Sequence, residues 1–444
     1  MNICKARKKY LESKHIQLLE KTGDYDNLTD RPNINYLSKS FFNELSQKYS
    51  QGTFLIIELC NLIIIENTYG HEVAATLFKS IELTLKTIAA DIEAVSKGDG
   101  GGFIVFKPCL TDKNSVKLFC DDIFAIFDNP FFVGGRNIYL FISIGTATYP
   151  HDGNSLSSTL KKAALALYKA KEQDINRAVF YYKGLQDEVS RKILIYNNLR
   201  DAVYKNELEV YYQPQVDQGL SKIVKFEALL RWNNEELGNV SPAEFIPISE
   251  ATGIIIELGE WILREVCKQI KEWMCKGWYY IIALNVSQKQ IQSDRFVDKV
   301  ISVLKEFDVP TNLIEIEVTE SILMSSYEGN INTIRRLQDM GIKIALDDFG
   351  TGYSSLSYLK TIPLDTIKID KSFIDDIVID SVSRDIVSGI ITLINKLRIN
   401  ITAEGVESKE QMELLRNMGC SIIQGYYYSK PLPAKAIEAM YFEF

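Results

Sequence analysis

Hydrophobic residues follow two alternating patterns in the second half of this chain of 444 residues. Short apolar runs with β-strand character alternate with longer stretches whose apolar positions repeat at helical spacing. The runs predict strands at 208–216, 224–227, 280–285, 313–317, 344–347, 366–368, 399–404 and 421–424, and helices at 256–276, 295–307, 330–340, 385–397 and 409–418. A strand and helix unit that recurs over about 250 residues is typical of a β/α (TIM-like) barrel.

The first half mixes the same two patterns in a less regular order. Strands are predicted at 53–59, 102–106 and 138–145, and helices at 6–21, from residue 70 onward, at 156–172 and at 188–206. This order predicts an α/β or α+β domain. The patterns therefore divide the chain into a lead-in helix (1–24), a first domain (25–184), a linker helix running into the barrel (185–206) and a barrel domain (207–444).

Composition is that of an ordinary globular protein, with 46% hydrophobic and 24% charged residues. No apolar run approaches the length of a membrane span, and the first residues lack the apolar core of a signal peptide, so a cytoplasmic protein is expected. Seven cysteines, an odd number with no Cys-x-x-Cys pair, indicate reduced structural thiols.

The charge balance and the scarcity of histidine narrow the function classes. A net charge of −8 argues against a protein that binds nucleic acid polymers, although it allows a small phosphorylated ligand. The three histidines, His15, His71 and His151, support neither a zinc cluster nor a Ser-His triad. If the chain is an enzyme, its metal ligands are oxygens.

Two adjacent carboxylates, Asp347 and Asp348, end one of the predicted barrel strands. Adjacent carboxylates repel one another and lose hydration, so solvent, loop N–H groups or a divalent cation must offset that cost. Further oxygen ligands at equivalent strand ends favour the cation, because strand ends face the mouth of a barrel. The polar residues at the predicted strand ends are Glu227, Asn285, Glu317, Asp347, Lys368, Glu404 and Gln424.

The segment Glu227-Ala-Leu-Leu-Arg231-Trp resembles the motif of the EAL family of cyclic di-GMP phosphodiesterases. The likeness runs from Tyr212-Gln-Pro-Gln to Lys430-Pro-Leu-Pro, and it implies an EAL-type barrel that uses Mg²⁺ or Mn²⁺. The resemblance implies metal ligands at Glu227, Asn285, Glu317, Asp347 and Asp348, an attacking water oriented and deprotonated by Lys368 and Glu404, substrate contacts from Arg231 and Gln424, and a loop anchor at Glu320.

The first domain is similar to the GGDEF family of diguanylate cyclases, which have a palm-like fold. The landmarks are Asp26-Asn-Leu-Thr-Asp, Asn67-Thr-Tyr-Gly-His, Ser143-Ile-Gly-Thr-Ala-Thr-Tyr-Pro and Ala166-Leu-Tyr-Lys-Ala-Lys. The family's catalytic positions are altered, however, with Gly101 and Gly102 in place of two acids, Glu58 in place of the first metal-binding Asp, and Glu66 and Ala75 in place of two guanine contacts. A glycine has no side chain to hold Mg²⁺, so a degenerate cyclase domain is expected.

Three hypotheses follow from these resemblances. The first is a metal-dependent phosphodiesterase that converts cyclic di-GMP to linear pGpG, with a regulatory or dimerising first domain and a homodimer formed through the EAL domain. The second is a non-enzymatic cyclic di-GMP receptor. The third, a cyclase or bifunctional enzyme, is disfavoured by Gly101 and Gly102. For the first domain, a structural spacer and residual nucleotide sensing both stay open.

Overall fold

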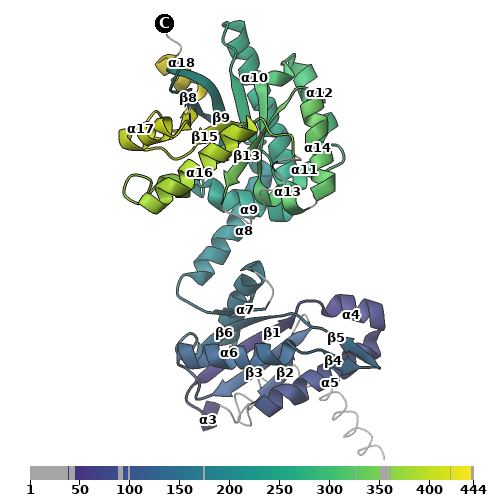
Figure 1. The fold of residues 1–444 in the computed structure, drawn as a ribbon. Coiled ribbons are helices and arrows are strands. Elements are labelled where there is room, and N and C mark those ends of the chain that lie inside the picture. Colours follow the sequence, from purple (N-terminus) through teal and green to yellow (C-terminus); the bar gives the residue numbers. More distant parts are fainter. Residues whose placement is uncertain are drawn as a thin grey trace, which may run out of the picture. The chain divides into compact units, whose positions relative to one another are not determined.

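The computed structural model describes residues 39, 46–88, 94–98, 101–173, 176–325, 327–350, 359, 362–420 and 422–441 (Figure 1). The chain divides into two compact units, Met1–Arg191 and Lys192–Phe444. The predicted lead-in helix (1–24) lies outside the described residues. None of the helices that the structure describes is long and apolar enough to cross a membrane.

The first unit is built on a five-stranded sheet with the order β2-β3-β1-β6-β7. Strand β1 pairs antiparallel with β3 and β6, whereas β6 and β7 are parallel. The strands of this unit are β1 (Gly52–Leu59), β2 (Ala94–Gly98), β3 (Gly102–Pro108), β4 (Phe131–Val133), β5 (Arg136–Ile138), β6 (Ile142–Tyr149) and β7 (Arg177–Phe180). Its helices are α3 (Ser46–Lys48), α4 (Leu62–Tyr69), α5 (His71–Ile88), α6 (Lys113–Phe127) and α7 (Leu156–Gln173).

The strand predicted at 138–145 is wrong as one continuous element. Strand β5 ends at Ile138 and forms a two-stranded sheet with β4, whereas β6 begins at Ile142 and joins the main sheet. The apolar run continues across the gap because both strands bury side chains of the same core, including Ile138, Leu140 and Ile142. An apolar run alone does not show where one strand ends and the next begins.

The second unit is a closed barrel, which confirms the predicted fold. Its ring contains eight strands in the order β9-β11-β12-β13-β14-β15-β16-β8, closed by pairing of β8 with β9. The ring is parallel except for β8, which is antiparallel to both neighbours. The ring strands are β8 (Leu208–Asp217), β9 (Lys222–Asn234), β11 (Ile281–Asn285), β12 (Ile314–Thr319), β13 (Lys343–Phe349), β14 (Thr366–Ile369), β15 (Asn400–Ala403) and β16 (Ile422–Gln424).

Helices surround the barrel strands, as Figure 1 shows for α10, α12, α14 and α16. They bury apolar side chains such as Val266, Val300 and Ile391 in one core with the strands. The remaining elements of this unit are α9 (Pro242–Thr252), α10 (Ile255–Cys275), α11 (Gln288–Ile291), α12 (Phe296–Phe307), α13 (Glu320–Ser325), α14 (Tyr327–Asp339), α15 (Lys371–Ile374), α16 (Ser381–Leu397), α17 (Lys409–Asn417), α18 (Ala434–Tyr441), the 3₁₀ helix η2 (Thr311–Leu313) and the short strands β10 (Gly238–Val240) and β17 (Leu432–Pro433).

Two predicted boundaries differ from the structure for local reasons. Glu227 does not end its strand, because β9 continues to Asn234 as one arm of a long antiparallel hairpin with β8. The linker helix α8 (Leu185–Ala202) ends before 206, where Asn206 takes a left-handed backbone with φ 55° that a helix cannot continue through. The proposed domain boundaries stay a prediction.

Candidate active site

A single lysine, Lys368 on β14, is the centre of the predicted site. Its side chain is fully buried, and four carboxylates approach its Nζ atom. The distances to Nζ are 2.7 Å from Glu404 Oε1, 2.9 Å from Glu317 Oε2, 3.1 Å from Asp347 Oδ1 and 3.4 Å from Glu227 Oε2. Four different barrel strands or strand ends therefore deliver acids to one point.

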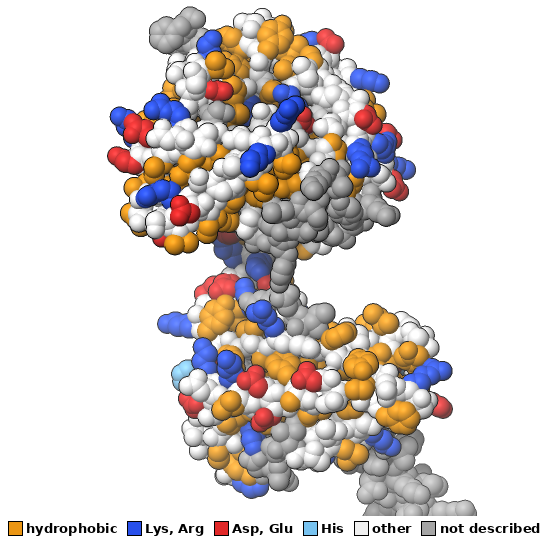
Figure 2. Space-filling model, in the orientation of Figure 1, with side chains coloured by type: hydrophobic (Ala, Val, Ile, Leu, Met, Phe, Trp, Pro, Cys, Tyr) orange, Lys and Arg blue, Asp and Glu red, His pale blue; other side chains and the backbone are white. Residues whose placement is uncertain are grey.

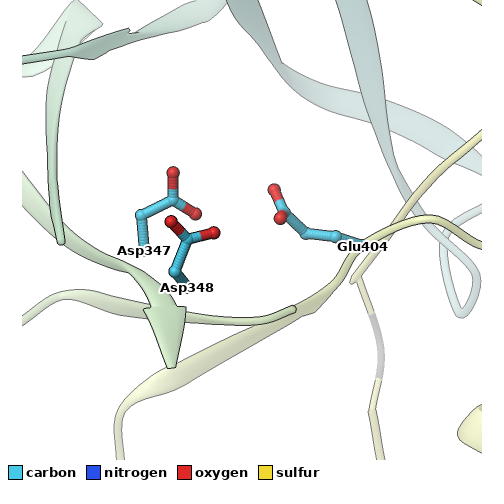
Figure 3. Close-up of side chains that lie close together, drawn as sticks. All are labelled: Asp347, Asp348 and Glu404. Atoms are coloured by element: carbon cyan, nitrogen blue, oxygen red, sulfur yellow. The ribbon is translucent and has the colours of Figure 1, made fainter. Parts of the chain in front are cut away.

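Asp347 and Asp348 both face this cluster although they are neighbours on one strand. Successive side chains of a regular strand point to opposite faces. Here the pairing of β13 with β14 shifts register between Leu346 and Phe349, and Asp348 takes a left-handed backbone with φ 54°. Figure 3 shows the two aspartates side by side, opposite Glu404. The irregularity therefore turns both carboxylates toward the barrel mouth, as bulges next to active sites commonly do.

Amide side chains hold Glu227 in place. Asn285 Nδ2 donates to Glu227 Oε1 at 2.7 Å, and Gln424 Nε2 donates to Glu227 Oε2 at 2.5 Å. With its N–H₂ group used in this way, Asn285 keeps its amide oxygen as the atom available to a cation. The structure thus brings together Glu227, Asn285 and Gln424, as their positions in the sequence predict.

Two glutamines that the sequence analysis did not single out fix the orientation of Gln424. Gln215 Nε2 donates to Gln424 Oε1 at 2.8 Å, and Gln424 Nε2 donates to Gln213 Oε1 at 3.0 Å. Gln213 can only accept here, because its own N–H₂ group donates to the Ser429 carbonyl. These contacts leave one amide orientation for Gln424, with its N–H₂ group toward Glu227. The sequence feature that could have identified these two glutamines is their spacing, because residues two apart on a strand, such as Gln213 and Gln215 on β8, share a face.

Replacing Gln215 tests this amide chain. We expect Gln215→Leu to lower the free energy of unfolding by about 1–3 kcal/mol, because Gln424 Oε1 becomes a buried acceptor without a donor. Urea denaturation measures the change. Gln218→Leu is the matched control, since both polar atoms of the Gln218 amide are buried and lack hydrogen-bond partners among the described residues. The control should be neutral or stabilising, and an equal loss in both variants would contradict the assigned orientation.

Burial and crowding change the pKa values of the acids. Burial raises the pKa of Glu404 to about 8. The charge of Lys368 lowers this pKa, but repulsion from Asp347 and Glu227 offsets part of that effect. Burial and the charge of Glu227 likewise raise the pKa of Glu317 well above its usual value. One lysine therefore does not neutralise the cluster.

The pKa shifts of Glu227 and Lys368, by contrast, favour the charged form of each side chain. Burial alone would raise the pKa of Glu227, but Lys368 and the two amides lower it. Burial opposes the charge on Lys368, yet the surrounding carboxylates raise its pKa well above the usual value. The pKa of Asp348 is raised by burial and by Asp347 beside it.

The residues present fit a divalent cation. Oxygen atoms of Asp347, Asp348 and Glu404 lie within 4.8 Å of one another (Figure 3). Glu317 Oε1 is buried and has no hydrogen-bond partner among the described residues. Several carboxylates with a single lysine leave an excess of negative charge, and an all-oxygen set suits Mg²⁺ or Mn²⁺ better than zinc.

Arg231 and Glu320 lie outside the cluster around Lys368. Arg231 lines a neighbouring cleft of about 880 Å³, where its guanidinium donates to the Leu230 carbonyl and lies over the ring of Tyr211. This cleft shares Leu229 with the hollow above Glu227, Asp347 and Glu404. Glu320 is buried at the start of α13, and the loop that it is predicted to anchor lies largely outside the described residues.

Fold and site together define a β/α-barrel protein with an acidic, oxygen-rich centre at the barrel mouth. The family model described as the EAL domain matches residues 196–431, and the model described as the diguanylate cyclase GGDEF domain matches residues 23–177. The chain belongs to the EAL domain family, and its first half carries a GGDEF domain, as the resemblances implied.

Curated relatives resemble the chain over nearly its whole length. The signaling protein YkoW of Bacillus subtilis is 34% identical over 99% of this chain and 55% of its own length. The cyclic di-GMP phosphodiesterase NbdA of Pseudomonas aeruginosa is 31% identical over 95% of this chain and 54% of its own length. The chain therefore spans about half the length of these relatives.

Two solved structures each match slightly more than half of the chain. The PaMucR phosphodiesterase in complex with c-di-GMP is 38% identical, with a TM-score of 0.54, over 55% of this chain and 99% of that chain. An EAL domain protein from Listeria monocytogenes EGD-e is 32% identical, with a TM-score of 0.50, over 56% of this chain and 98% of that chain.

Proposed function

We propose that the barrel unit hydrolyses cyclic di-GMP to linear pGpG with the help of Mg²⁺ or Mn²⁺. The observation that carries the proposal is the convergence of Glu227, Glu317, Asp347 and Glu404 on buried Lys368. The likeness to phosphodiesterases named for cyclic di-GMP supports the choice of substrate. The 880 Å³ cleft beside the cluster has room for a ligand of dinucleotide size.

The chain's own residues account for the steps of the reaction. Asp347, Asp348, Glu227, Glu317 and the Asn285 amide oxygen would hold the cations, which when bound lower the pKa of water and offset the charge on the phosphate. Water attacks one bridging phosphorus, the bond from phosphorus to the ribose 3′ oxygen breaks, and the leaving oxygen takes up a proton.

Proton removal falls to Glu404 in this proposal. Its carboxylate is 2.7 Å from Lys368 Nζ, which orients it and donates to the attacking oxygen. Arg231 at the wall of the cleft would contact a phosphate, and Gln424 would help to place the water. The product keeps the phosphate on a 5′ oxygen, which gives pGpG.

A chelator experiment tests the proposal. Full-length protein treated with EDTA and dialysed should release no pGpG from cyclic di-GMP, and added Mn²⁺ or Mg²⁺ should restore the product on chromatography. Hydrolysis that is unaffected by EDTA would contradict the assignment of the acids as cation ligands. Binding of cyclic di-GMP without hydrolysis under both metals would instead favour a receptor.

We further propose that the GGDEF unit makes no cyclic di-GMP and acts as a regulatory or dimerising unit. Gly101 has a left-handed backbone with φ 91°, and Gly102 begins β3 opposite Glu58. Glu58 is ion-paired with Lys171 at 2.6 Å. No acid is present at the two glycine positions to hold Mg²⁺ against a triphosphate.

Restoring an acid at Gly102 should destabilise the unit rather than activate it. A Cβ atom at this position would lie 1.9 Å from the Ile57 carbonyl oxygen, so the backbone of two paired strands must shift. We expect Gly102→Glu to cost about 1–3 kcal/mol of unfolding free energy and to give no cyclic di-GMP from GTP. Product formation by this variant would overturn the proposal.

A homodimer through the EAL domain is also proposed. The α15–α16 region exposes apolar side chains, with Ile379 83%, Val382 63% and Ile386 47% exposed. Figure 2 shows hydrophobic side chains gathered along α16 on the barrel unit. Exposed apolar patches of this kind commonly mark protein interfaces. Light scattering should give a dimer mass for the parent and a monomer mass for Ile379→Glu, and a parent monomer at every concentration would contradict the proposal.

A further inference from the structure

A second hollow lies behind the wall that carries Asn285. It is a chamber of about 210 Å³ between α10, α11 and α12. Its interior is apolar and includes Leu263, Val300 and Ile316, each at most 5% exposed. A dry cavity of about 150 Å³ lined by Leu, Ile and Phe is large enough to bind benzene, so this chamber can hold one substituted aromatic ring.

The chamber and the 880 Å³ cleft share a wall. Gly259, Leu284, Asn285 and Gln290 line both hollows. A larger residue at position 259 would displace the Gln290 side chain, because a Cβ atom there would lie 1.9 Å from Gln290 Nε2. The Gln290 amide therefore lies against Gly259 of α10, in the wall between the two hollows.

The Gln290 amide has donor capacity that the chain does not use. Gln290 is 6% exposed, and its Oε1 accepts from Ser287 N at 3.1 Å and from Ser287 Oγ at 2.8 Å. Because the backbone N–H of Ser287 can only donate, this capping box fixes the amide orientation. No described residue accepts a hydrogen bond from Nε2. The Nε2 atom is therefore a donor on a largely buried side chain that a ligand or water at the wall can use.

The rim of the chamber carries a net positive charge. Glu260 is paired with Lys299 at 3.0 Å and with Arg264 at 3.2 Å, so its charge is already offset. Arg295, which is exposed on the same rim, makes no ion pair with any residue in the part of the chain that the structure describes. An apolar interior, one amide donor without a partner among the described residues and an unpaired cation at the rim together favour an apolar monoanion as the ligand.

We propose that this chamber binds a small aromatic carboxylate. The ring occupies the apolar interior formed by Leu263, Val300 and Ile316, and the carboxylate accepts from Gln290 Nε2 and is attracted by Arg295. Asn285 lies in the wall between the chamber and the cluster around Lys368, but the proposed contacts of the ring and the carboxylate involve none of the acids of that cluster. Binding can therefore be measured whether or not the barrel hydrolyses cyclic di-GMP.

Calorimetric titration of the full chain with phenylacetate tests the proposal. We expect saturable binding of one molecule per chain, and about tenfold weaker binding of neutral phenylacetamide, because charged hydrogen bonds contribute more than neutral ones. Gln290→Glu should weaken phenylacetate binding by at least about tenfold, since it removes the donor, adds a negative charge and keeps the capping box. Arg295→Gln should weaken it severalfold.

Two control variants locate the site. Lys305→Gln removes an exposed cation from the far end of α12 and should leave the affinity unchanged. Arg231→Ala should also leave it unchanged, because Arg231 lines the cleft and not the chamber. Absence of saturable binding would overturn the proposal, as would binding that is lost with Arg231→Ala but kept with Gln290→Glu. If Gln290→Glu does not fold, the exposed Arg295→Gln variant tests the proposal, and unchanged affinity for phenylacetate in that variant would overturn it.

Discussion

Glu404→Gln should reduce the hydrolysis of cyclic di-GMP by roughly 10²–10⁴-fold, the range that a positioned general base contributes. Glutamine keeps the shape of the side chain and can still accept from Lys368, but it cannot take a proton from the attacking water. The turnover rate should fall while the affinity for cyclic di-GMP changes little. Steady-state release of pGpG and equilibrium binding of the substrate measure the two effects separately.

Glu407→Gln is the matched control for this variant. Glu407 lines the same hollow but is exposed and paired with Lys371 at 2.5 Å, away from Lys368. Its replacement should change turnover by less than about threefold, because exposed ion pairs contribute little. Equal losses in the two variants would show that the hollow is sensitive to any lost charge, and would contradict the assignment of Glu404 as the base.

Lys368→Met should abolish activity and also destabilise the fold. Removing the lysine leaves four carboxylates at one buried point without a cation, and breaking a buried ion pair in this way costs about 3–5 kcal/mol. Urea denaturation in the presence of a chelator measures the loss. Lys371→Met, which removes an exposed lysine from the rim, should change the unfolding free energy by less than about 0.5 kcal/mol.

The destabilisation by Lys368→Met should depend on pH in a defined direction. The pKa of Glu404 is about 8 in the folded protein even with Lys368 present, above the value of about 4.3 expected in the unfolded chain. A folded state with raised carboxyl pKa values binds more protons than the unfolded state, so stability is lost as pH rises between these values. Lys368 lowers the pKa values of Glu227 and Glu404 in the parent, and its removal raises both. The deficit of the variant relative to the parent should therefore be smallest at acid pH and largest above about pH 8, where Glu404 is ionised in the parent but still protonated in the variant. The opposite trend would contradict the assigned electrostatics.

The barrel and most of its acids were predictable because the polar residues interrupt otherwise apolar strands. The same strands carry a second polar layer that the sequence analysis passed over. Lys225 and Glu315 form a buried ion pair with Thr366 as a further partner, each two residues before an acid or lysine of the site. Positions two apart on a strand share a face, so the spacing of these residues in the sequence could have predicted this second layer.

Other features depend on contacts between distant segments and could not be predicted. The amide orientation of Gln424 is set by Gln213 and Gln215, which lie about 200 residues earlier in the chain and reach it only when β8 closes the barrel. The turn of Asp348 toward the cluster depends on a register shift between β13 and β14. The chamber behind Asn285 is formed by packing of α10 against α12, which no local pattern encodes.

The central claim is that the acids around Lys368 form a phosphodiesterase site. Its most direct test is incubation of the full chain with cyclic di-GMP and Mn²⁺, with pGpG followed by chromatography for the parent and for Glu227→Ala in parallel. Product from the parent, with at least about a hundredfold less from the variant, is the predicted result. Equal product from both proteins would contradict the claim, as would no product from a parent that binds both Mn²⁺ and cyclic di-GMP.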